Sequence, residues 1–354
     1  MKLIRLILFI GLCLSIVSSV HGADEIVLKD KHPSSYQVKR GDTLWEIASR
    51  FLRDPWRWPD IWYVNPQIHN PHVIYPGDEV VLTYKDGKPR LELRRGASHN
   101  GLRIIKLTPE IRKQELSRPI PTIPIDAIQQ FLSRPRIITR DEAKHLPYVV
   151  SSQDAHLVAG SGDKVYASGI LPSENNRYTI IRSGQTFRDS DRGKNRVLGH
   201  EAIYVGEALV TQYGDPSTLE VTQSEREILR GDLLIPATAQ QLDYNFVPNA
   251  PIDQVRGQII AVVDGVSRIG QYQVVVINRG TSHGMDKGHV LAVYQTGTTV
   301  RDTVREGIFG SGDVTLPDER IGYLMVFRPF EKLSYALVMK ATRDMQIYDM
   351  VVNP

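Results

Sequence analysis

Alternating apolar and polar positions run through the second half of the chain. From Pro147 to Pro354, β-branched residues alternate with polar ones, and Gly and Asp interrupt these runs. Successive side chains of a β-strand point to opposite faces of a sheet, so a period of two indicates short strands separated by turns. The pattern predicts a mostly-β body for this part of the protein.

Three stretches of this body share one order of elements. Residues 217–236, 271–293 and 334–354 each begin with an apolar alternating run, continue with about ten polar residues and a short turn containing Gly or Asp, and end with a second apolar run. A unit that recurs in this way is typical of small barrels and sandwiches, in which each copy contributes equivalent strands. We expect one of these architectures.

A helical period appears near the N-terminus, in YQVKRGDTLWEIASRF (36–51). The run Tyr36–Val38 predicts a short strand, which the following Gly-Asp pair would end. Thr43 with Glu46 three residues later matches a helix capping box, and the preceding Asp is a competing cap. The helix would bury one apolar face at i, i+3, i+4 and i+7, comprising Leu44, Ile47, Ala48 and Phe51.

The next segment completes a small module. A second helix is predicted in WPDIWYVN (58–65), because Pro59 suits a first helical turn and the Asn-Pro pair at 65–66 ends the pattern. VIYPGDEVVL (73–82) turns at its Pro-Gly pair and continues as a strand. The predicted fold class is therefore α+β, with a small βααβ module followed by a mostly-β C-terminal body of small barrels or a sandwich of repeated β units.

Three dispersed motifs of this module resemble a LysM module. They are GDTLWEIA (41–48), NPQI (65–68) and IYPGDEVVL (74–82), in that order and at LysM spacing, although the segment LRDPWRWPD (52–60) between the helices is longer than in short LysM modules. The resemblance implies binding of N-acetylglucosamine-containing glycans, peptidoglycan or chitin, in a groove between the first strand–helix loop and the loop before the second strand. Carried over by position, the groove residues are Gly41, Asp42, Thr43, Leu44, Asn65, Pro66, Gln67, Ile68, Ile74, Tyr75 and Pro76.

Such a groove is chemically reasonable for an acetamido sugar. Backbone amides at a helix start and in a turn can hydrogen-bond the acetamido group, while apolar side chains cover its methyl group and the sugar face. Leu44, Trp45 and Ile74 can equally be core residues of a small domain. Trp56 and Trp58 can either stack on sugar or pack over the helices.

Composition divides the chain further. All four tryptophans lie within eighteen residues, 45–62, and the stretch 85–118 has ten Lys or Arg against four Asp or Glu. RPIPTIPID (118–126) favours an extended spacer, and short helices are expected at 125–133 and after a Thr-Arg-Asp-Glu capping box at 139–142. The expected domains are a signal peptide (1–22), the LysM module (33–84), a basic proline-bearing connector (85–124), short helices with a first β domain (125–240) and a second β domain (250–354).

The first residues have the pattern of a secretion signal. Lys2 and Arg5 precede an apolar stretch, and a plausible cleavage site lies at 20–22. Cys13 is the single cysteine of the chain, so cleavage would leave no disulfide and no thiol nucleophile. Loss of the two basic residues lowers the formal charge from +3 (43 minus 40) to +1, which gives no general attraction for nucleic acid. We expect a location in the bacterial periplasm, associated with the cell wall.

Several motifs resemble catalytic or metal sites but are incomplete. TSHGM (281–285) resembles the L,D-transpeptidase signature, yet Met285 stands where that signature continues to its cysteine; because the two sister repeats have no Ser-His pair here, we predict a turn. Ser161 and Lys164 match Ser-x-x-Lys without the accompanying motifs, and 189–195 begins like a calcium loop with its glycine misplaced. His69 and His72 have no third ligand nearby. We expect no enzyme activity, metal or cofactor.

The whole chain resembles the type IV pilus secretin-associated protein family. The resemblance rests on the signal, the LysM motifs, the basic connector and the C-terminal region ending LPDERIGYLMVFRPFEKLSYALVMKATRDMQIYDMVVNP. It implies a flagellar-assembly-protein-T-like β region and a non-enzymatic role, tying an outer-membrane secretin to peptidoglycan, with several copies around a ring-shaped partner. The alternatives are a wall-remodelling enzyme targeted by its LysM module, and a general envelope assembly protein.

Overall fold

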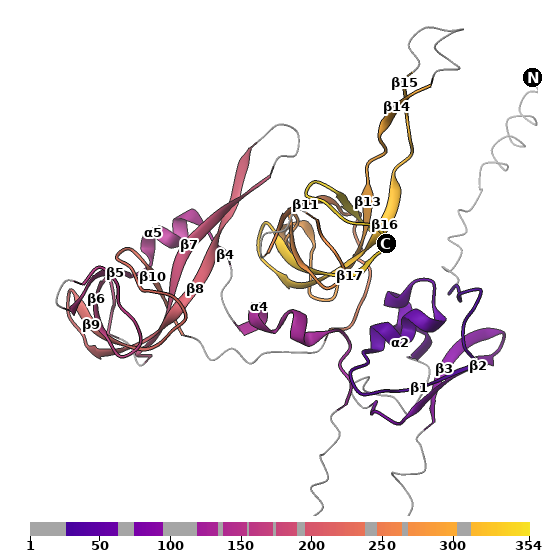
Figure 1. The fold of residues 1–354 in the computed structure, drawn as a ribbon, viewed down its shortest axis with the longest axis horizontal. Coiled ribbons are helices and arrows are strands. Elements are labelled where there is room, and N and C mark those ends of the chain that lie inside the picture. The colour runs from indigo at the N-terminus through magenta and orange to yellow at the C-terminus, as the bar shows by residue number, and fades with distance from the viewer. Residues whose placement is uncertain are drawn as a thin grey trace, which may run out of the picture. The chain divides into compact units, whose positions relative to one another are not determined.

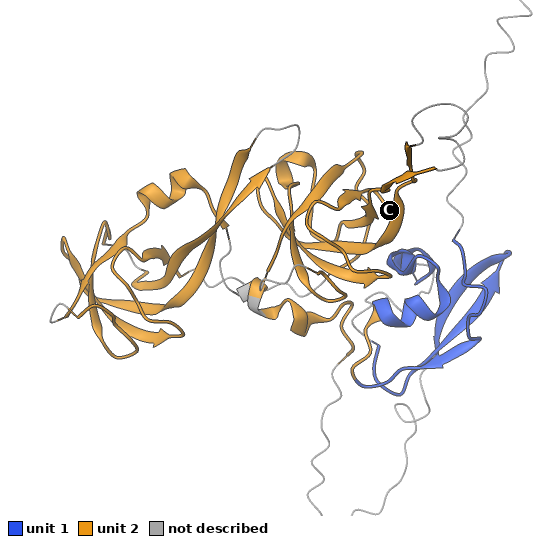
Figure 2. Cartoon of the chain, turned by 45° about the horizontal axis from the view of Figure 1, so that its top comes forward, with its two compact units in different colours: residues 1–40, 45–70, 74–118 blue, residues 41–44, 71–73, 119–354 orange. Residues whose placement is uncertain are grey.

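The computed structural model divides into two compact units (Figure 2). It describes residues 26–62, 74–94, 119–133, 137–153, 156–172, 175–189, 195–237, 246–263, 268–302 and 313–354. One unit comprises 1–40, 45–70 and 74–118, and the other comprises 41–44, 71–73 and 119–354. The expected signal peptide, the loop residues 190–194 and the two histidines at 69 and 72 lie outside the described residues. Within the described parts, no helix is long and apolar enough to cross a membrane.

The N-terminal module has the predicted βααβ order with one added strand (Figure 1). Its elements are β1 (Ser35–Gln37), α2 (Leu44–Phe51), the 3₁₀ turn η1 (Pro55–Arg57), α3 (Trp58–Trp62), β2 (Glu79–Lys85) and β3 (Lys88–Arg94). The strands form an antiparallel sheet in the order β1-β2-β3. The predicted apolar face of α2 is fully buried, at Leu44, Ile47, Ala48 and Phe51.

Strand β3 lies in the stretch expected to form the basic connector. Asp86 and Gly87 join β2 to β3, and both have positive φ, 51° and 75°. An Asp-Gly pair with this backbone is a strongly favoured two-residue hairpin turn, because its twist matches that of the flanking strands. Leu91 and Leu93 are buried, whereas Lys88, Glu92 and Arg94 are exposed. The charged residues at 88, 92 and 94 therefore belong to the exposed side of a strand.

The second unit contains a first barrel formed by β5 to β10. These strands are β5 (Tyr148–Ser152), β6 (Lys164–Ser168), β7 (Arg177–Asp189), β8 (Arg196–Gln212), β9 (Ser217–Ser224) and β10 (Leu233–Pro236). They pair in the closed order β5-β6-β9-β8-β7-β10, which returns to β5. Strand β4 (Ile137–Ile138) adds to β8 outside the barrel. Helix α5 (Arg140–His145) begins with the predicted capping box of Thr139 and Glu142.

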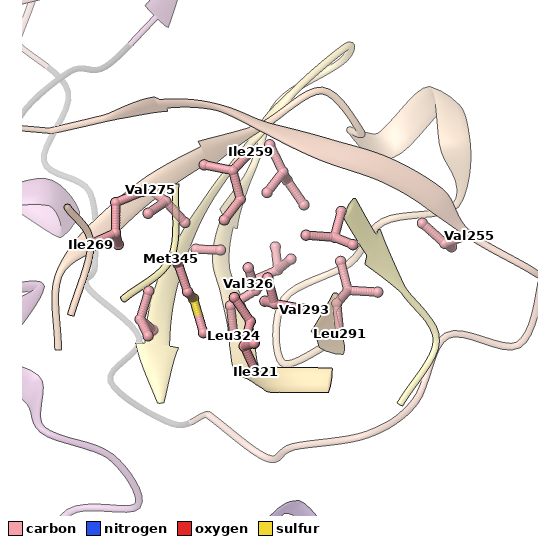
Figure 3. Close-up of a cluster of buried hydrophobic side chains, with 14 of the residues drawn as sticks. Val255, Ile259, Ile269, Val275, Leu291, Val293, Ile321, Leu324, Val326 and Met345 are labelled. Carbon is pink, nitrogen blue, oxygen red and sulfur yellow. The ribbon is translucent and has the colours of Figure 1, made fainter. Parts of the chain in front are cut away.

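A second barrel follows with the same strand order. It consists of β11 (Arg256–Val262), β12 (Val274–Ile277), β13 (Val290–Gln295), β16 (Glu319–Pro329), β17 (Ser334–Ala341) and β18 (Met350–Val352). Numbered along the chain within each barrel, the strands pair in the order 1-2-5-4-3-6 in both. Its interior holds branched side chains such as Ile259, Leu291 and Val293 together with Met345 (Figure 3). The prediction of a mostly-β body built from barrels is confirmed.

Both barrels carry an elongated hairpin at the third and fourth strands (Figure 1). In the first barrel this is the β7–β8 hairpin. In the second, β13 and β16 continue outward into β14 (Thr299–Arg301) and β15 (Asp313–Thr315). Ahead of the barrels, a 3₁₀ turn η3 (Ile125–Ala127) and α4 (Gln129–Ser133) form the first predicted short helix.

One turn geometry recurs six times in the described residues. In each four-residue turn, the fourth residue's side chain accepts the first residue's N–H, the fourth N–H donates to the first carbonyl, and the third residue has positive φ. The six turns are 75–78, 160–163, 229–232, 270–273, 286–289 and 346–349. Gly occupies the third position in four of them, because it adopts positive φ without strain, and Tyr272 and Tyr348 occupy it in the other two.

Each turn docks on a buried β-branched residue of a strand or strand end. The third N–H donates to that residue's carbonyl, and that residue's N–H donates to the fourth carbonyl. The docking residues are Val38, Val221, Val149, Val338, Val326 and Ile259, in the order of the turns above. The three sequence repeats each contain one such turn. The repeat thus reflects the turn residues, most often Gly and Asp, whereas the residue on which each of these turns docks lies outside its repeat.

His289 fills the fourth position of one turn and makes that turn sensitive to pH. Its Nδ1 accepts the N–H of Asp286 at 3.0 Å, which requires an unprotonated Nδ1, and burial lowers the pKa of His289. The unfolded chain therefore binds the proton more readily. The stability contributed by neutral His289 is complete above the unfolded pKa of about 6.5 and is lost as the pH falls through the folded-state pKa.

We predict that His289→Gln removes part of the acid sensitivity of the second barrel. Glutamine stays neutral, and Gln273 occupies the same position in the 270–273 turn. Denaturant melts of both proteins between about pH 5 and pH 7.5 would test this. His145→Gln is the control, because it makes the same replacement at an exposed residue of α5 that belongs to none of the six turns. A wild-type pH profile retained in the His289 variant would contradict the assignment.

Candidate functional site

The loop before β2 is held by the recurring turn at 75–78. Gly77 N–H donates to the carbonyl of Val38 and Val38 N–H donates to the carbonyl of Asp78, both at 2.8 Å. The buried Asp78 carboxylate accepts the Tyr75 N–H at 3.0 Å. These bonds fix the loop beside the end of β1. Among the predicted groove residues, Ile74 is fully buried, whereas Tyr75 and Pro76 keep part of their surface exposed.

In the loop before α2, the groups that a ligand could contact are mostly backbone groups and not side chains. Gly41 is exposed with a φ of 92°, a conformation that favours glycine. Asp42 is partly exposed, but Thr43 and Leu44 are buried, at 3% and 0% exposure. The side chain of Leu44 is therefore a core residue, and what this position can present to a ligand is its amide.

That amide already has a partner. The N–H of Leu44, the first residue of α2, donates to the carbonyl of Pro121 at 3.0 Å. The first amides of a helix have no acceptor within the helix, so they remain available to outside acceptors. Around Pro121, the connector residues Ile120, Thr122 and Ile123 are buried. The proline-bearing segment thus lies against the 41–44 loop, and the two belong to the same compact unit (Figure 2).

The tryptophans are mostly core residues. Trp45, Trp58 and Trp62 are each 2% exposed, and the rings of Trp58 and Trp62 meet edge to face with centroids 5.5 Å apart. Trp56 is partly exposed, with the guanidinium of Arg57 5.9 Å from its ring centroid. Of the two tryptophans whose role the sequence left open, Trp58 therefore packs in the core. The predicted groove residues Asn65, Pro66, Gln67 and Ile68 lie outside the described residues.

The Ser-His pair of the second barrel forms a turn, as predicted. Residues 281–283 are a 3₁₀ turn (η6) between β12 and β13. The Ser282 hydroxyl donates to the carbonyl of Glu331 at 2.6 Å, and His283 Nδ1 accepts the Gly280 N–H at 3.2 Å. Met285 is buried at 2% exposure. The Ser282 hydroxyl thus holds the turn against the β16–β17 loop, whereas His283 Nδ1 accepts a hydrogen bond within the turn and lies 3.2 Å from Ser282 Oγ.

The Ser-x-x-Lys motif lies within the described residues, and its serine takes part in a turn of the fold. Ser161 and Gly162 form the middle of the 160–163 turn, and the Ser161 hydroxyl donates to the carbonyl of Thr222 at 3.2 Å. Within the described ranges, no group of three or more His, Cys, Asp or Glu side chains is placed to hold a metal ion. Of the residues expected to form the glycan groove, Gly41, Asp42, Tyr75 and Pro76 are exposed or partly exposed.

Comparison with known proteins identifies the module that carries these loops. A protein of Bacillus subtilis (strain 168), the uncharacterized protein YqbP, is 40% identical over 60 residues, which cover 14% of this chain and 27% of that relative. The chain thus spans about a quarter of the relative's length. The LysM domain model matches residues 36–83, the span from β1 to β2 that contains both loops. Residues 36–83 are therefore a LysM domain, a module that binds peptidoglycan or related carbohydrate.

Proposed function

We propose that this protein is a non-enzymatic wall-binding protein of the bacterial periplasm that anchors an outer-membrane secretin of the type IV pilus to peptidoglycan. The LysM domain supports the wall-binding part. The sequence resemblance to secretin-associated proteins supports the partner, and the two barrels offer an extended body on which a partner can bind. Several copies around a ring-shaped secretin would strengthen weak individual glycan contacts.

The proposed glycan site is the LysM groove, with Gly41, Asp42, Thr43, Leu44, Asn65, Pro66, Gln67, Ile68, Ile74, Tyr75 and Pro76 as its residues. The observation that carries it is the Leu44 amide, which binds a peptide carbonyl at 3.0 Å. The acetamido group of N-acetylglucosamine presents the same kind of carbonyl. Tyr75 and Pro76 offer partly exposed apolar surface for a sugar face.

The remodelling-enzyme alternative gains no support from the Ser-His pair. Ser282 Oγ lies 3.2 Å from His283 Nδ1, but the hydroxyl also donates to the Glu331 carbonyl at 2.6 Å and Nδ1 also accepts the Gly280 N–H, so both groups are engaged in backbone hydrogen bonds of the turn. We therefore retain the anchoring function.

We expect the full chain to co-sediment with purified sacculi and Tyr75→Ala to weaken this binding several-fold. Loss of the tyrosine ring removes apolar contact worth about 1 to 2 kcal/mol. Tyr84→Ala is the matched control, because Tyr84 is a 61% exposed tyrosine of β2 in the same module. Calorimetry with N-acetylglucosamine oligomers gives the affinities directly. Equal binding by the two variants would exclude Tyr75 from the site.

The secretin partner is tested separately. Crosslinked pull-down from intact envelopes should recover the secretin with the wild-type chain and with the Tyr75 variant alike. Cells that carry the Tyr75 variant should show fewer surface pili and reduced twitching motility. Recovery of sacculus fragments without any secretin would leave wall binding intact and refute the anchoring role.

A further inference from the structure

The long hairpin of the first barrel contacts the second barrel. Asn278, just after β12, donates from Nδ2 to the Asp189 carboxylate at the end of β7, at 2.8 Å. The Asn278 Oδ1 accepts the N–H of Gln258 on β11 at 2.7 Å. Asn278 is 1% exposed. A buried side-chain amide with both ends bonded joins the hairpin to one end of the second barrel.

Further contacts cover the same end of the second barrel. A Cβ atom placed on Gly199 of β8 would lie 3.9 Å from Leu333, in the loop between β16 and β17. Leu333 is 1% exposed. Arg328 of β16 donates to the carbonyl of Phe131 in α4 at 2.6 Å, and the ring of Phe131 meets that of Tyr335 edge to face at 6.1 Å. This end is therefore closed by the β7–β8 hairpin and α4 together.

The second barrel has the same kind of hairpin at the same topological position. Ile181 pairs with the first residue of β10, and Tyr294 pairs with the first residue of β18, so these two positions are equivalent. The eighth residue outward from each is an aspartate, Asp189 in one hairpin and Asp302 in the other. Val300, two residues before Asp302, is 41% exposed.

The closed end of the second barrel has a counterpart in the first barrel. This counterpart exposes three large apolar side chains. Ser168 is the fifth residue after the 160–163 turn, and Asn278 is the fifth residue after the corresponding 270–273 turn of the second barrel. Ser168 pairs with Tyr148. Ala167 pairs with Ser217, and Thr218 pairs with Gln212, so the loops at 169–172 and 213–216 lie at this same end. Tyr148, Leu171 and Tyr213 are 47%, 78% and 36% exposed there.

We infer that this end of the first barrel is an interaction surface for a second copy of the same chain. The β14–β15 hairpin of one copy docks on it, as the β7–β8 hairpin docks on the second barrel within the chain. The occupant follows from the duplicated topology. Each barrel has one long hairpin and one end on which such a hairpin can dock, which we call its receiving end. The contact within the chain uses the hairpin of the first barrel and the receiving end of the second, so the other hairpin and the other receiving end remain. Such a contact joins two different surfaces, so it can propagate from chain to chain into rings or open filaments. The inference does not rest on glycan binding.

Complementation between two full-length variants tests this. Leu171→Asp places a charge on the receiving end, and Val300→Asp places one on the hairpin. The wild-type chain should associate with increasing concentration in sedimentation velocity, and each variant alone should remain monomeric. An equimolar mixture should form a dimer that grows no further, because it contains one intact hairpin facing one intact receiving end. Circular dichroism confirms that both variants are folded.

Leu157→Asp is the matched control. Leu157 is 92% exposed and lies in the connection between β5 and β6, at the opposite end of the same barrel. This variant should associate like the wild type. A wild-type chain that stays monomeric at all concentrations, a mixture of variants that stays monomeric, or an equal loss with Leu157→Asp would each overturn the proposal. Sacculus binding by the monomeric variants separates this outcome from a failure of the wall-binding function.

Discussion

Replacing Asp232 with alanine is expected to destabilise the first barrel by about 2 to 3 kcal/mol. Asp232 is the fourth residue of the 229–232 turn and is 2% exposed. Its carboxylate accepts Nε and Nη2 of Arg182, each at 2.8 Å, and the Leu229 N–H at 2.7 Å. The hydrogen bond to Asp232 raises the pKa of Arg182. Removing the carboxylate leaves the turn amide without its acceptor and takes two hydrogen bonds from the partly buried guanidinium, whose Nη2 also donates to the Glu227 carbonyl at 2.7 Å.

Asp163→Ala is the matched control for this prediction. Asp163 has the same position in the 160–163 turn and accepts the Gly160 N–H at 2.7 Å, but it is exposed. Loss of one exposed hydrogen bond costs about 1 kcal/mol. Because all four tryptophans lie at 45–62, tryptophan fluorescence does not report on this barrel; amide hydrogen exchange in β7 and β10 does. Equal loss of protection in the two variants would show that the ion pair contributes nothing beyond the turn.

The second large effect concerns the connector. Replacing Ile120 and Ile123 with aspartate in the full chain should increase the affinity for N-acetylglucosamine oligomers about tenfold. Both residues are buried, at 3% and 0% exposure, and they flank the Pro121 carbonyl that occupies the Leu44 amide. Aspartate at these positions would favour release of the segment, because burying a charge is costly. A sugar carbonyl could then take the amide without first displacing the peptide.

Thr122→Val should have the opposite effect. Thr122 is fully buried, and its hydroxyl has no hydrogen-bond partner among the described residues. Valine keeps the shape and removes the unsatisfied hydroxyl, which should hold the connector more firmly and lower the glycan affinity. Calorimetry on the two variants gives both changes, and thermal melts exclude misfolding. Affinities that move in the same direction, or not at all, would show that the connector does not compete with the glycan.

Local chemistry made much of the N-terminal module predictable. The helix α2 follows from apolar residues at helical spacing, and all four of these side chains are fully buried. The turn at 75–78 follows from its Pro-Gly-Asp sequence, because glycine supplies the positive φ and aspartate accepts the amide three residues earlier. The hairpin from β2 to β3 carried an equally local signal in Asp86-Gly87, which the high charge of the stretch obscured.

The repeats in the second half were also visible, but their meaning depended on pairing. The sequence showed recurring runs of strand, polar segment and turn. It did not show that the strands close into two six-stranded barrels of identical order. Closure pairs the first strand of each barrel with the last, β5 with β10 and β11 with β18, and these strands lie far apart in the sequence. The turns are local, whereas their docking residues lie on distant strands, as Val149 does for the 229–232 turn.

The sequence by itself therefore determined the LysM domain, the β character of the body and the turns, since each depends on residues a few positions apart. The tertiary structure alone decided which turn amides meet which strands, that Asn278 joins Asp189, and that the Leu44 amide meets the Pro121 carbonyl. The last two contacts join residues 89 and 77 positions apart along the chain. Backbone carbonyls and exposed loop ends have no distinctive residue type, so such contacts leave no pattern in the sequence.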